Sequence, residues 1–284
     1  MKKILDKIKN NKEILILPVL FVVLVFAVIK FAGLNIGMDK AQKEYERLSS
    51  TVKHRDTDKT TGGIIRIETD KLVVNSDGEE HVSVVEEQDN KNRFKEIIRQ
   101  NQDFAAWIYI PGTKIDYPVM LRPDDPNYYL HRSFNGEYND NGAIYIGVGC
   151  DLNSDNIMVH GHHLNNGSMF GELSNYKKED FYKEHPIVLF DTVEKNGEYE
   201  VFAVCRERVY EESVKNVFKY YEYGGKLSRE DYEFYVNQMK KDSLYDTGIT
   251  PEYGQQLLTL STCSYILDDG SGRFVVVAAR KDND

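Results

Sequence analysis

The sequence predicts a mainly β protein, folded as a barrel or sandwich of short strands, and three features between residues 90 and 284 lead to this prediction. Runs rich in β-branched and aromatic residues recur, Gly, Pro, Asn and Asp separate them, and one helical stripe of any length interrupts them. We expect antiparallel pairing. The strand candidates are eight runs: Trp107–Ile110, Ile115–Met120, Gly142–Ile146, Asn156–His160, Ile187–Phe190, Tyr199–Cys205, Leu257–Leu260 and Phe274–Ala279.

The composition is that of one domain of ordinary size with appendages. The chain has 284 residues, of which 41% are hydrophobic and 29% charged, and its net charge is −10. Since basic residues concentrate only at the N-terminus, nucleic acid is not the expected partner. Three widely spaced cysteines predict neither a disulfide framework nor a C-x-x-C zinc site. Cys150 and Cys205 are interpreted as small buried hydrophobic residues.

The N-terminal segment predicts a membrane anchor. Residues 1–13 carry five lysines, and residues 14–34 are almost entirely apolar. At 1.5 Å per residue this run crosses roughly 30 Å of hydrocarbon, with Lys30 near its end. The basic flank places the N-terminus in the cytoplasm, which predicts a single-pass protein of the cell membrane with its later residues outside the cell. A cleaved signal peptide is the competing interpretation, but no A-x-A site follows the run.

Residues 35–89 are polar and poor in aromatic side chains, and we interpret them as an extracytoplasmic stalk. Two strand-like pieces, Ile64–Ile67 and Leu72–Val74, are too isolated to form a domain. Residues 90–284 then form the predicted catalytic domain.

Two helices are expected within that domain. Residues 92–102 have Phe94, Ile97 and Ile98 at helical spacing. A second helix begins at the capping box that starts with Ser228. Its apolar stripe predicts a face docked on the barrel, within an insertion that covers residues 206–254; the stripe is formed by Tyr232, Tyr235, Val236 and Met239.

The segment from Leu257 to Arg280 carries the candidate chemistry. Cys263 follows one predicted strand and Arg273 begins the next, so both lie at the end of a rigid element. A cysteine attacks as the thiolate, which a neighbouring base or cation must supply or stabilise. We therefore predict that Cys263 is a nucleophile, that Arg273 is its electrostatic partner, and that a histidine upstream is the base.

Three of the seven histidines cluster at the end of another predicted strand, in the segment His160-Gly161-His162-His163. We expect Gly161 to allow a sharp backbone turn there. A metal site would need further ligands, and no residues downstream complete a set. Packing histidines are the second interpretation. In the third, one of the histidines pairs with Cys263, which requires the two strand ends to be adjacent in space.

These segments together resemble the sortases, the membrane-anchored cysteine transpeptidases of Gram-positive bacteria. The resemblance rests on Gly161-His162-His163, on Gly167-Ser-Met-Phe, on Thr259-Leu-Ser-Thr-Cys263, and on Arg273 followed by Phe-Val-Val-Val-Ala. It covers roughly residues 90–284 and is closest to class B, which also shows a W-I-x-I strand, a Y-Y-L segment and a helix between late strands. It implies a closed barrel of about eight strands with an N-terminal helix.

The resemblance also implies a role for each site residue. His162 would be the acid/base, Cys263 would attack the threonine carbonyl of a sorting signal, and Arg273 would hold the signal and stabilise the oxyanion. Leu130, Ser261 and Thr262 would line the groove for the signal. His160 and His163 would be neighbours, His163 packed beside the site.

The implied reaction transfers a secreted protein to an amine of peptidoglycan or its precursor, through a thioester and without a cofactor or metal. The implied signal is similar to NPxTx, SPxTG or LPxTG. Pilin polymerisation is an alternative, suggested by the long stalk, and a non-catalytic surface-binding module on a stalk is an alternative of another class. A papain-like protease would place its cysteine before its histidine, the reverse of the order found here.

Overall fold

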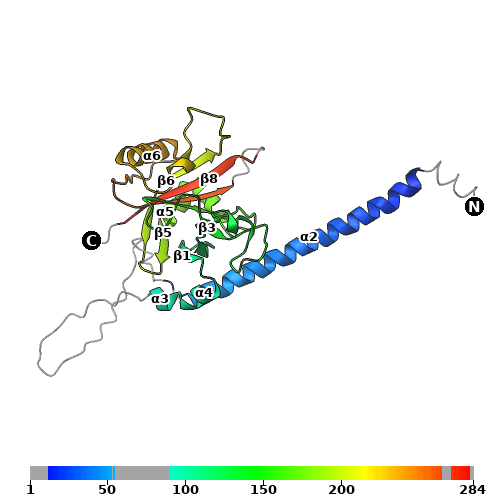
Figure 1. Ribbon diagram of the computed structural model, residues 1–284. Helices are drawn as coiled ribbons and strands as arrows, with labels where there is room; N and C mark the ends of the chain where they lie inside the picture. The colour runs from blue at the N-terminus through cyan, green and yellow to red at the C-terminus, as the bar shows by residue number, and fades with distance from the viewer. Residues whose placement is uncertain (1–11, 53, 55–89, 264–269, 282–284) are drawn as a thin grey trace, which may run out of the picture. The chain divides into compact units, whose positions relative to one another are not determined.

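A computed structural model describes residues 12–52, 54, 90–263 and 270–281 of the chain. The chain divides into two compact units, Met1–Glu44 and Tyr45–Asp284. The second unit contains all the described strands (Figure 1). The strand-like pieces 64–67 and 72–74, like His81 and most of the predicted stalk, lie outside the described residues.

Eight strands close into a barrel, as predicted. Around the barrel they follow the order β1-β2-β3-β4-β7-β8-β6-β5, and β5 pairs with β1 to complete the ring. The strands are β1 Phe104–Tyr109, β2 Asp116–Met120, β3 Ile144–Ile146, β4 Asn156–His160, β5 Ile187–Thr192, β6 Glu198–Arg208, β7 Leu257–Cys263 and β8 Gly272–Arg280. Each coincides with one of the eight predicted runs.

The pairing is not purely antiparallel, which corrects the sequence prediction. β2 pairs with β3 in parallel, and so does β4 with β7. Parallel neighbours need a crossover connection, whereas antiparallel neighbours can be joined by a short turn. Both crossovers are present: residues 121–143 connect β2 to β3, and two strands and the insertion lie between β4 and β7. Local sequence patterns carry no information about such distant pairing.

The β7 strand is buried on both faces, which explains its continuous apolar run. Leu258 and Leu260 alternate along it with Thr259 and Ser261, and all four side chains are at most 2% exposed. The insertion covers the face of β7 that carries Thr259 and Ser261, and the hydroxyl groups of these two residues form hydrogen bonds with two tyrosine hydroxyl groups of the insertion. The opposite face belongs to the barrel interior.

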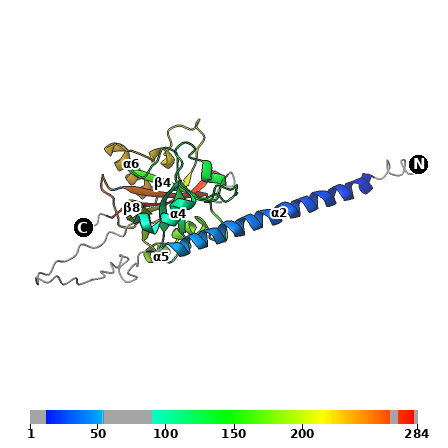
Figure 2. The same ribbon diagram turned by 60° about the horizontal axis from the view of Figure 1, so that its bottom comes forward.

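The insertion between β6 and β7 carries a short 3-10 helix, η3 (Tyr220–Tyr223), and the helix α6 (Arg229–Asp242). α6 lies on the outside of the barrel beside β6 (Figures 1 and 2). Its N-cap is Ser228, whose Oγ accepts the Asp231 amide at 3.1 Å, so the predicted start of the helix is confirmed. The predicted apolar stripe is buried in full: Tyr232, Tyr235, Val236 and Met239.

Short helices complete the domain: α3 (Asn90–Arg93), α4 (Lys95–Gln100), η1 (Tyr128–His131), η2 (Gly171–Lys177) and α5 (Glu179–Glu184). α3 and α4 together form the helix predicted before the first strand, and Phe94 and Ile97 are buried as expected.

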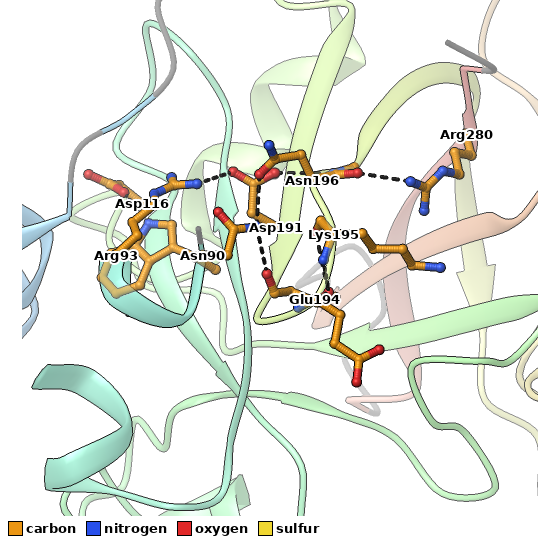
Figure 3. A network of polar contacts seen from close by, with 11 residues as sticks. Asn90, Arg93, Asp116, Asp191, Glu194, Lys195, Asn196 and Arg280 are labelled. Carbon is orange, nitrogen blue, oxygen red and sulfur yellow. Dashed lines mark hydrogen bonds and ion pairs between the residues drawn. The ribbon is translucent and has the colours of Figure 1, made fainter. Parts of the chain in front are cut away.

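A polar network attaches α3 to the β5–β6 turn (Figure 3). The Arg93 guanidinium donates to Asp191 at 2.7 Å, with both side chains at most 4% exposed. Asn90 Nδ2 donates to the Thr192 carbonyl and to Asn196 Oδ1, both at 2.9 Å. Asp191 also accepts the Gly197 amide at 3.1 Å, so its buried carboxylate has both a cation and an amide as partners, which offsets the cost of burying its charge.

The helix α2 (Lys12–Thr51) ends inside the second unit. Tyr45 packs edge-on against Tyr117 at 5.3 Å, and Leu48 is fully buried. Just beyond the helix, His54 lies 3.1 Å from Asp116 and stacks on Tyr109. Tyr45–Val52 and His54, which lie within the range predicted as stalk, therefore contribute to the barrel unit.

Asp116 is the centre of this contact. It accepts hydrogen bonds from Ser49 and from the Trp107 indole, the latter at 2.7 Å. Burial opposes ionisation of Asp116, but the hydrogen bonds from His54, Ser49 and Trp107 and the charge on His54 lower its pKa overall. None of the helices in the described parts of the chain is both long enough and apolar enough to cross a membrane.

Replacing Arg93 with alanine should lower the free energy of unfolding by about 3 kcal/mol, because Asp191 would keep a buried charge without its partner. Urea unfolding measures this value. Arg99→Ala is the matched control: Arg99 follows in α4, and its pair with Glu96 is exposed by 70% and 64%. That change should alter stability by less than about 0.5 kcal/mol. Equal effects of the two substitutions would contradict a structural role for the buried pair.

Candidate active site

The ends of β4 and β7 lie side by side, which is the adjacency that a pairing of the histidine cluster with Cys263 requires. The parallel ladder runs from the Asn156–Leu257 pair to the His160–Ser261 pair, and the Gly161 amide adds a hydrogen bond to the Ser261 carbonyl at 3.2 Å. His162 and Cys263 each follow two residues beyond the last pair, on strands that lie about 4.8 Å apart. They therefore emerge at one edge of the barrel.

Cys263 is exposed and lies opposite Arg273 in the antiparallel β7–β8 ladder. The Arg273 guanidinium donates to the carbonyl groups of Gly270 at 3.0 Å and Gly272 at 2.9 Å. These bonds hold the cation near the start of its own strand. The thiol and the guanidinium predicted to act together thus lie on adjacent strands, at directly opposed positions.

Two buried tyrosines border this pair. Burial raises the pKa of Tyr145 to about 12, with a further contribution from Cys263 and a smaller opposing one from Arg273. Burial likewise raises the pKa of Tyr220 to about 12, and both Arg273 and Cys263 influence it. The two phenols remain protonated at neutral pH, and they lie within electrostatic reach of the thiol and the guanidinium.

The three clustered histidines have different surroundings. The His160 ring lies tilted against the Tyr145 ring, with 5.5 Å between ring centroids, and burial together with the charge of Arg273 lowers the pKa of His160 to about 4. The backbone of His163 forms an isolated β-bridge with Met169, and burial lowers the pKa of the His163 side chain. The His162 ring lies 5.9 Å from the His131 ring. Burial and His131 lower the pKa of His162, while Asp140 acts in the opposite direction.

Comparison with known proteins agrees with this geometry. Residues 108–281 match the model of the sortase domain family. The chain is 29% identical over 188 residues to sortase B of Listeria monocytogenes, covering 66% of this chain and 73% of the relative. It is 27% identical over 190 residues to sortase B of Staphylococcus aureus, with the same coverage. The solved sortase B of Clostridium perfringens shares 33% identity over 66% of this chain and 99% of that one, with a TM-score of 0.57.

The chain belongs to the sortase family. It is a cysteine transpeptidase of the class B type, and the predicted family resemblance is confirmed.

In this sortase, no hydrogen bond within the described part of the chain joins the Cys263 thiol to the His162 ring. The backbone of His162 is nonetheless held firmly, because its carbonyl accepts the Phe170 amide at 3.0 Å. The predicted base is thus positioned by the segment that follows it, rather than by the predicted nucleophile.

The reason for glycine before His162 differs from the expected one. Gly161 has no positive φ, so no special backbone turn requires it. A Cβ at this position would instead lie 2.4 Å from the Ile144 side chain and 2.8 Å from the Phe170 ring. Close packing, rather than a left-handed backbone conformation, therefore requires the glycine.

The three predicted groove residues have unequal surroundings. Ser261 is buried, and its hydroxyl lies 2.8 Å from the Tyr220 hydroxyl. Thr262 is 2% exposed, and within the described residues its Oγ1 has no hydrogen-bond partner. Leu130 is half-buried in η1, directly before the His131 that lies beside His162. All three lie near the strand ends, but only Leu130 is partly open to solvent.

Several neighbours of the site did not emerge from the sequence. They are His131, Asp140, Tyr145, Glu207 and Tyr220. Two weak signals existed: His131 directly follows the Y-Y-L segment, and Tyr145 lies in a predicted strand. Glu207 is the β6 residue that pairs with Arg273, and burial and Asp242 raise its pKa to about 7. Such groups become neighbours through strand register, which local sequence does not reveal.

His160 and Glu207 should give opposite pH dependences of stability. Between pH 6.5 and 4, His160 is protonated in the unfolded chain but neutral in the folded protein. The free energy of unfolding therefore falls as the pH falls through this range, by on the order of 1–2 kcal/mol. His160→Gln should flatten this dependence.

Between pH 7 and 4.5 Glu207 binds its proton more tightly in the folded protein than in the unfolded chain, and the free energy of unfolding rises with falling pH. Glu207→Gln removes this gain, so the loss of stability with falling pH should become steeper, as measured by urea unfolding at several pH values. A steeper loss in His160→Gln together with a flatter one in Glu207→Gln would show both pKa directions to be wrong.

Proposed function

We propose that Cys263 is the nucleophile of this sortase, that His162 is its acid/base, and that Arg273 stabilises the oxyanion and holds the substrate backbone. The observation that supports this assignment is the convergence of three strand ends. His162 lies two residues beyond the end of β4, Cys263 is the last residue of β7, and Arg273 lies opposite the thiol on β8. Groups on strands hold their positions more rigidly than groups on loops, which suits a transition state of defined geometry.

The proposed reaction has two steps. In the first, the Cys263 thiolate attacks the threonine carbonyl of a sorting signal, and Arg273 stabilises the developing oxyanion. His162 gives its proton to the leaving amine, so that a thioester remains. In the second step an acceptor amine attacks the thioester carbon, and His162 takes a proton from its nitrogen as the C–S bond breaks. A new amide bond is formed and no cofactor is consumed.

The proposed substrates are secreted proteins with a C-terminal signal similar to NPxTx, SPxTG or LPxTG. The acceptor is an amine of peptidoglycan or of its precursor. Two solved relatives support this choice: one is described as a substrate complex of Staphylococcus aureus sortase B, and another as sortase B complexed with triglycine. A glycine peptide presents the kind of primary amine that the second step needs.

We further propose that residues 14–34 anchor the protein in the cell membrane, with residues 1–13 in the cytoplasm. Residues 35–89 then lead to a catalytic domain, residues 90–284, outside the cell. The support is the sequence alone: the run from Ile14 to Ile29 is apolar throughout and follows a lysine-rich flank, whereas no helix among the described residues meets the length and apolarity of a membrane span. Within α2 the side chains from Val19 to Phe26 are 41–66% exposed, as expected of side chains that face lipid.

Cys263→Ala should abolish the thioester formed with a sorting-signal peptide, as detected by mass spectrometry. His162→Ala should slow its formation on the order of 10³-fold, and Arg273→Lys on the order of 10²-fold, since lysine lacks the planar fork. Cys205→Ala, which removes a fully buried thiol, and His163→Ala are the controls and should have far smaller effects.

A His163→Ala variant more damaged than His162→Ala would overturn the choice of base. Cleavage of the peptide by Cys263→Ala at the parental rate would overturn the choice of nucleophile. A chain that binds signal peptides without any thioester would be the non-catalytic module. Pilin subunits, rather than peptidoglycan amines, as the preferred acceptor would indicate the polymerising alternative.

Charged residues in the proposed span should release the protein from the membrane. Val22→Arg combined with Val23→Arg costs about 5–7 kcal/mol of insertion free energy if these residues cross the bilayer. We expect the double variant to move from the membrane fraction to the soluble fraction. Gln42→Arg with Ser50→Arg, further along the same helix, should leave fractionation unchanged. A mature N-terminus found after residue 34 would instead indicate a cleaved signal peptide.

A further inference from the structure

The connection between β2 and β3 gathers three exposed side chains that the proposed mechanism does not use. An isolated bridge pairs Arg132 with Tyr138, and the Asn139 amide donates to the His131 carbonyl at 3.0 Å. This fold-back brings the Tyr138 ring to 6.5 Å from the His131 ring, at an interplanar angle of 28°. The Tyr138 hydroxyl donates to Asp140 Oδ1 at 2.5 Å. We call His131, Tyr138 and Asp140 the acceptor triad.

The acceptor triad lies beside His162. The His131 and His162 rings are 5.9 Å apart, and the Asp140 carboxylate is close enough to raise the pKa of His162 against the effects of burial and of His131. Within the described residues these are the two titratable groups that affect His162, and both come from the same connection. The solvent-exposed approach to His162 from this side therefore passes over the triad.

Described residues occupy two other sides of the Cys263 position. Arg273 lies opposite Cys263 on the neighbouring strand β8. Tyr220 of the insertion covers the face of β7 that carries Ser261. The leaving amine and the incoming amine must exchange at one position, because His162 protonates the first and deprotonates the second. Among the residues that the structure describes, the side of His162 away from the insertion offers an approach lined by exposed side chains.

From this geometry we propose that the acceptor triad is the binding subsite for the acceptor, and that it takes a primary amine in its ammonium form. The proposal rests on the proposed function, since it presupposes a thioester at Cys263. An aromatic face next to a carboxylate is the combination that attracts an ammonium group. Tyr138 is 71% exposed, the highest value among the large apolar side chains described in the barrel unit.

The subsite explains how a charged amine becomes a nucleophile. The ammonium binds at Asp140 and Tyr138 and releases one proton to solvent. The neutral nitrogen then attacks the thioester carbon with its lone pair, and its second proton goes to His162. As the C–N bond forms, the C–S bond breaks and Cys263 leaves as the thiolate. Enrichment of the ammonium beside His162 raises the rate of this step relative to hydrolysis by water.

The test compares two acceptors on the same thioester enzyme. Triglycine carries an ammonium group, whereas hydroxylamine is small and largely uncharged at neutral pH. Product mass spectrometry gives kcat/KM for each acceptor, and their ratio is the readout. Asp140→Asn and Tyr138→Leu should each lower the triglycine-to-hydroxylamine ratio about threefold to tenfold. Asp140→Glu, which keeps the charge, should restore most of the ratio.

Asp124→Asn is the matched control, because Asp124 lies in the same connection and is 76% exposed, but pairs with Arg122 instead. It should leave the ratio unchanged. An unchanged ratio in Asp140→Asn overturns the subsite, and so does an equal loss with both acceptors, which would mean that Asp140 only positions His162. If the parent enzyme forms no thioester with any signal peptide, the proposed function itself fails, and the subsite fails with it.

Discussion

The parallel pairing of β4 with β7 is the constraint on which the rest of the site depends. It places two strand ends at one edge, although the strands are separated in sequence by two other strands and the insertion. Asn156, at the start of the ladder, reinforces the pairing. Its Oδ1 accepts the Thr259 hydroxyl at 2.8 Å, and its Nδ2 donates to the Tyr223 carbonyl at 2.9 Å. One buried amide thus fixes both strands and the insertion.

Cys263 is exposed because the insertion covers the residues before it on β7 but not Cys263 itself. Thr259, Ser261 and Cys263 share one face of β7, because side chains alternate along a strand. Tyr235 bonds to Thr259 and Tyr220 bonds to Ser261, each at 2.8 Å, so the insertion buries the first two positions. The third position of the same row is the exposed thiol. Two buried, hydrogen-bonded hydroxyl groups thus precede the accessible sulfur atom on the same face of β7.

The sequence predicted the eight strands, the capped helix and the buried cysteines, because each depends on local periodicity or on a single residue type. It did not predict the parallel pairs or the packing of Tyr45 and Leu48, since both depend on contacts between distant segments. The adjacency of the His162 and Cys263 strand ends was required by the hypothesis and is present, but their spacing in sequence could not establish it. Asp140 had no local signal, because its position follows from the fold-back of the β2–β3 connection.

The charges of the groups around Cys263 follow from their burial and from their places on the strands. Arg273 is a permanent positive charge on the opposed strand, whereas burial keeps Tyr145 and Tyr220 protonated, so neither adds negative charge nearby. His160 is neutral because burial and Arg273 lower its pKa to about 4. A neutral His160 cannot compete with Arg273 for an anion, and it cannot serve as an acid at neutral pH. Of His160 and His162, it is His162 whose ring borders the exposed His131, which supports the proposal that His162 is the residue that exchanges a proton with the amine.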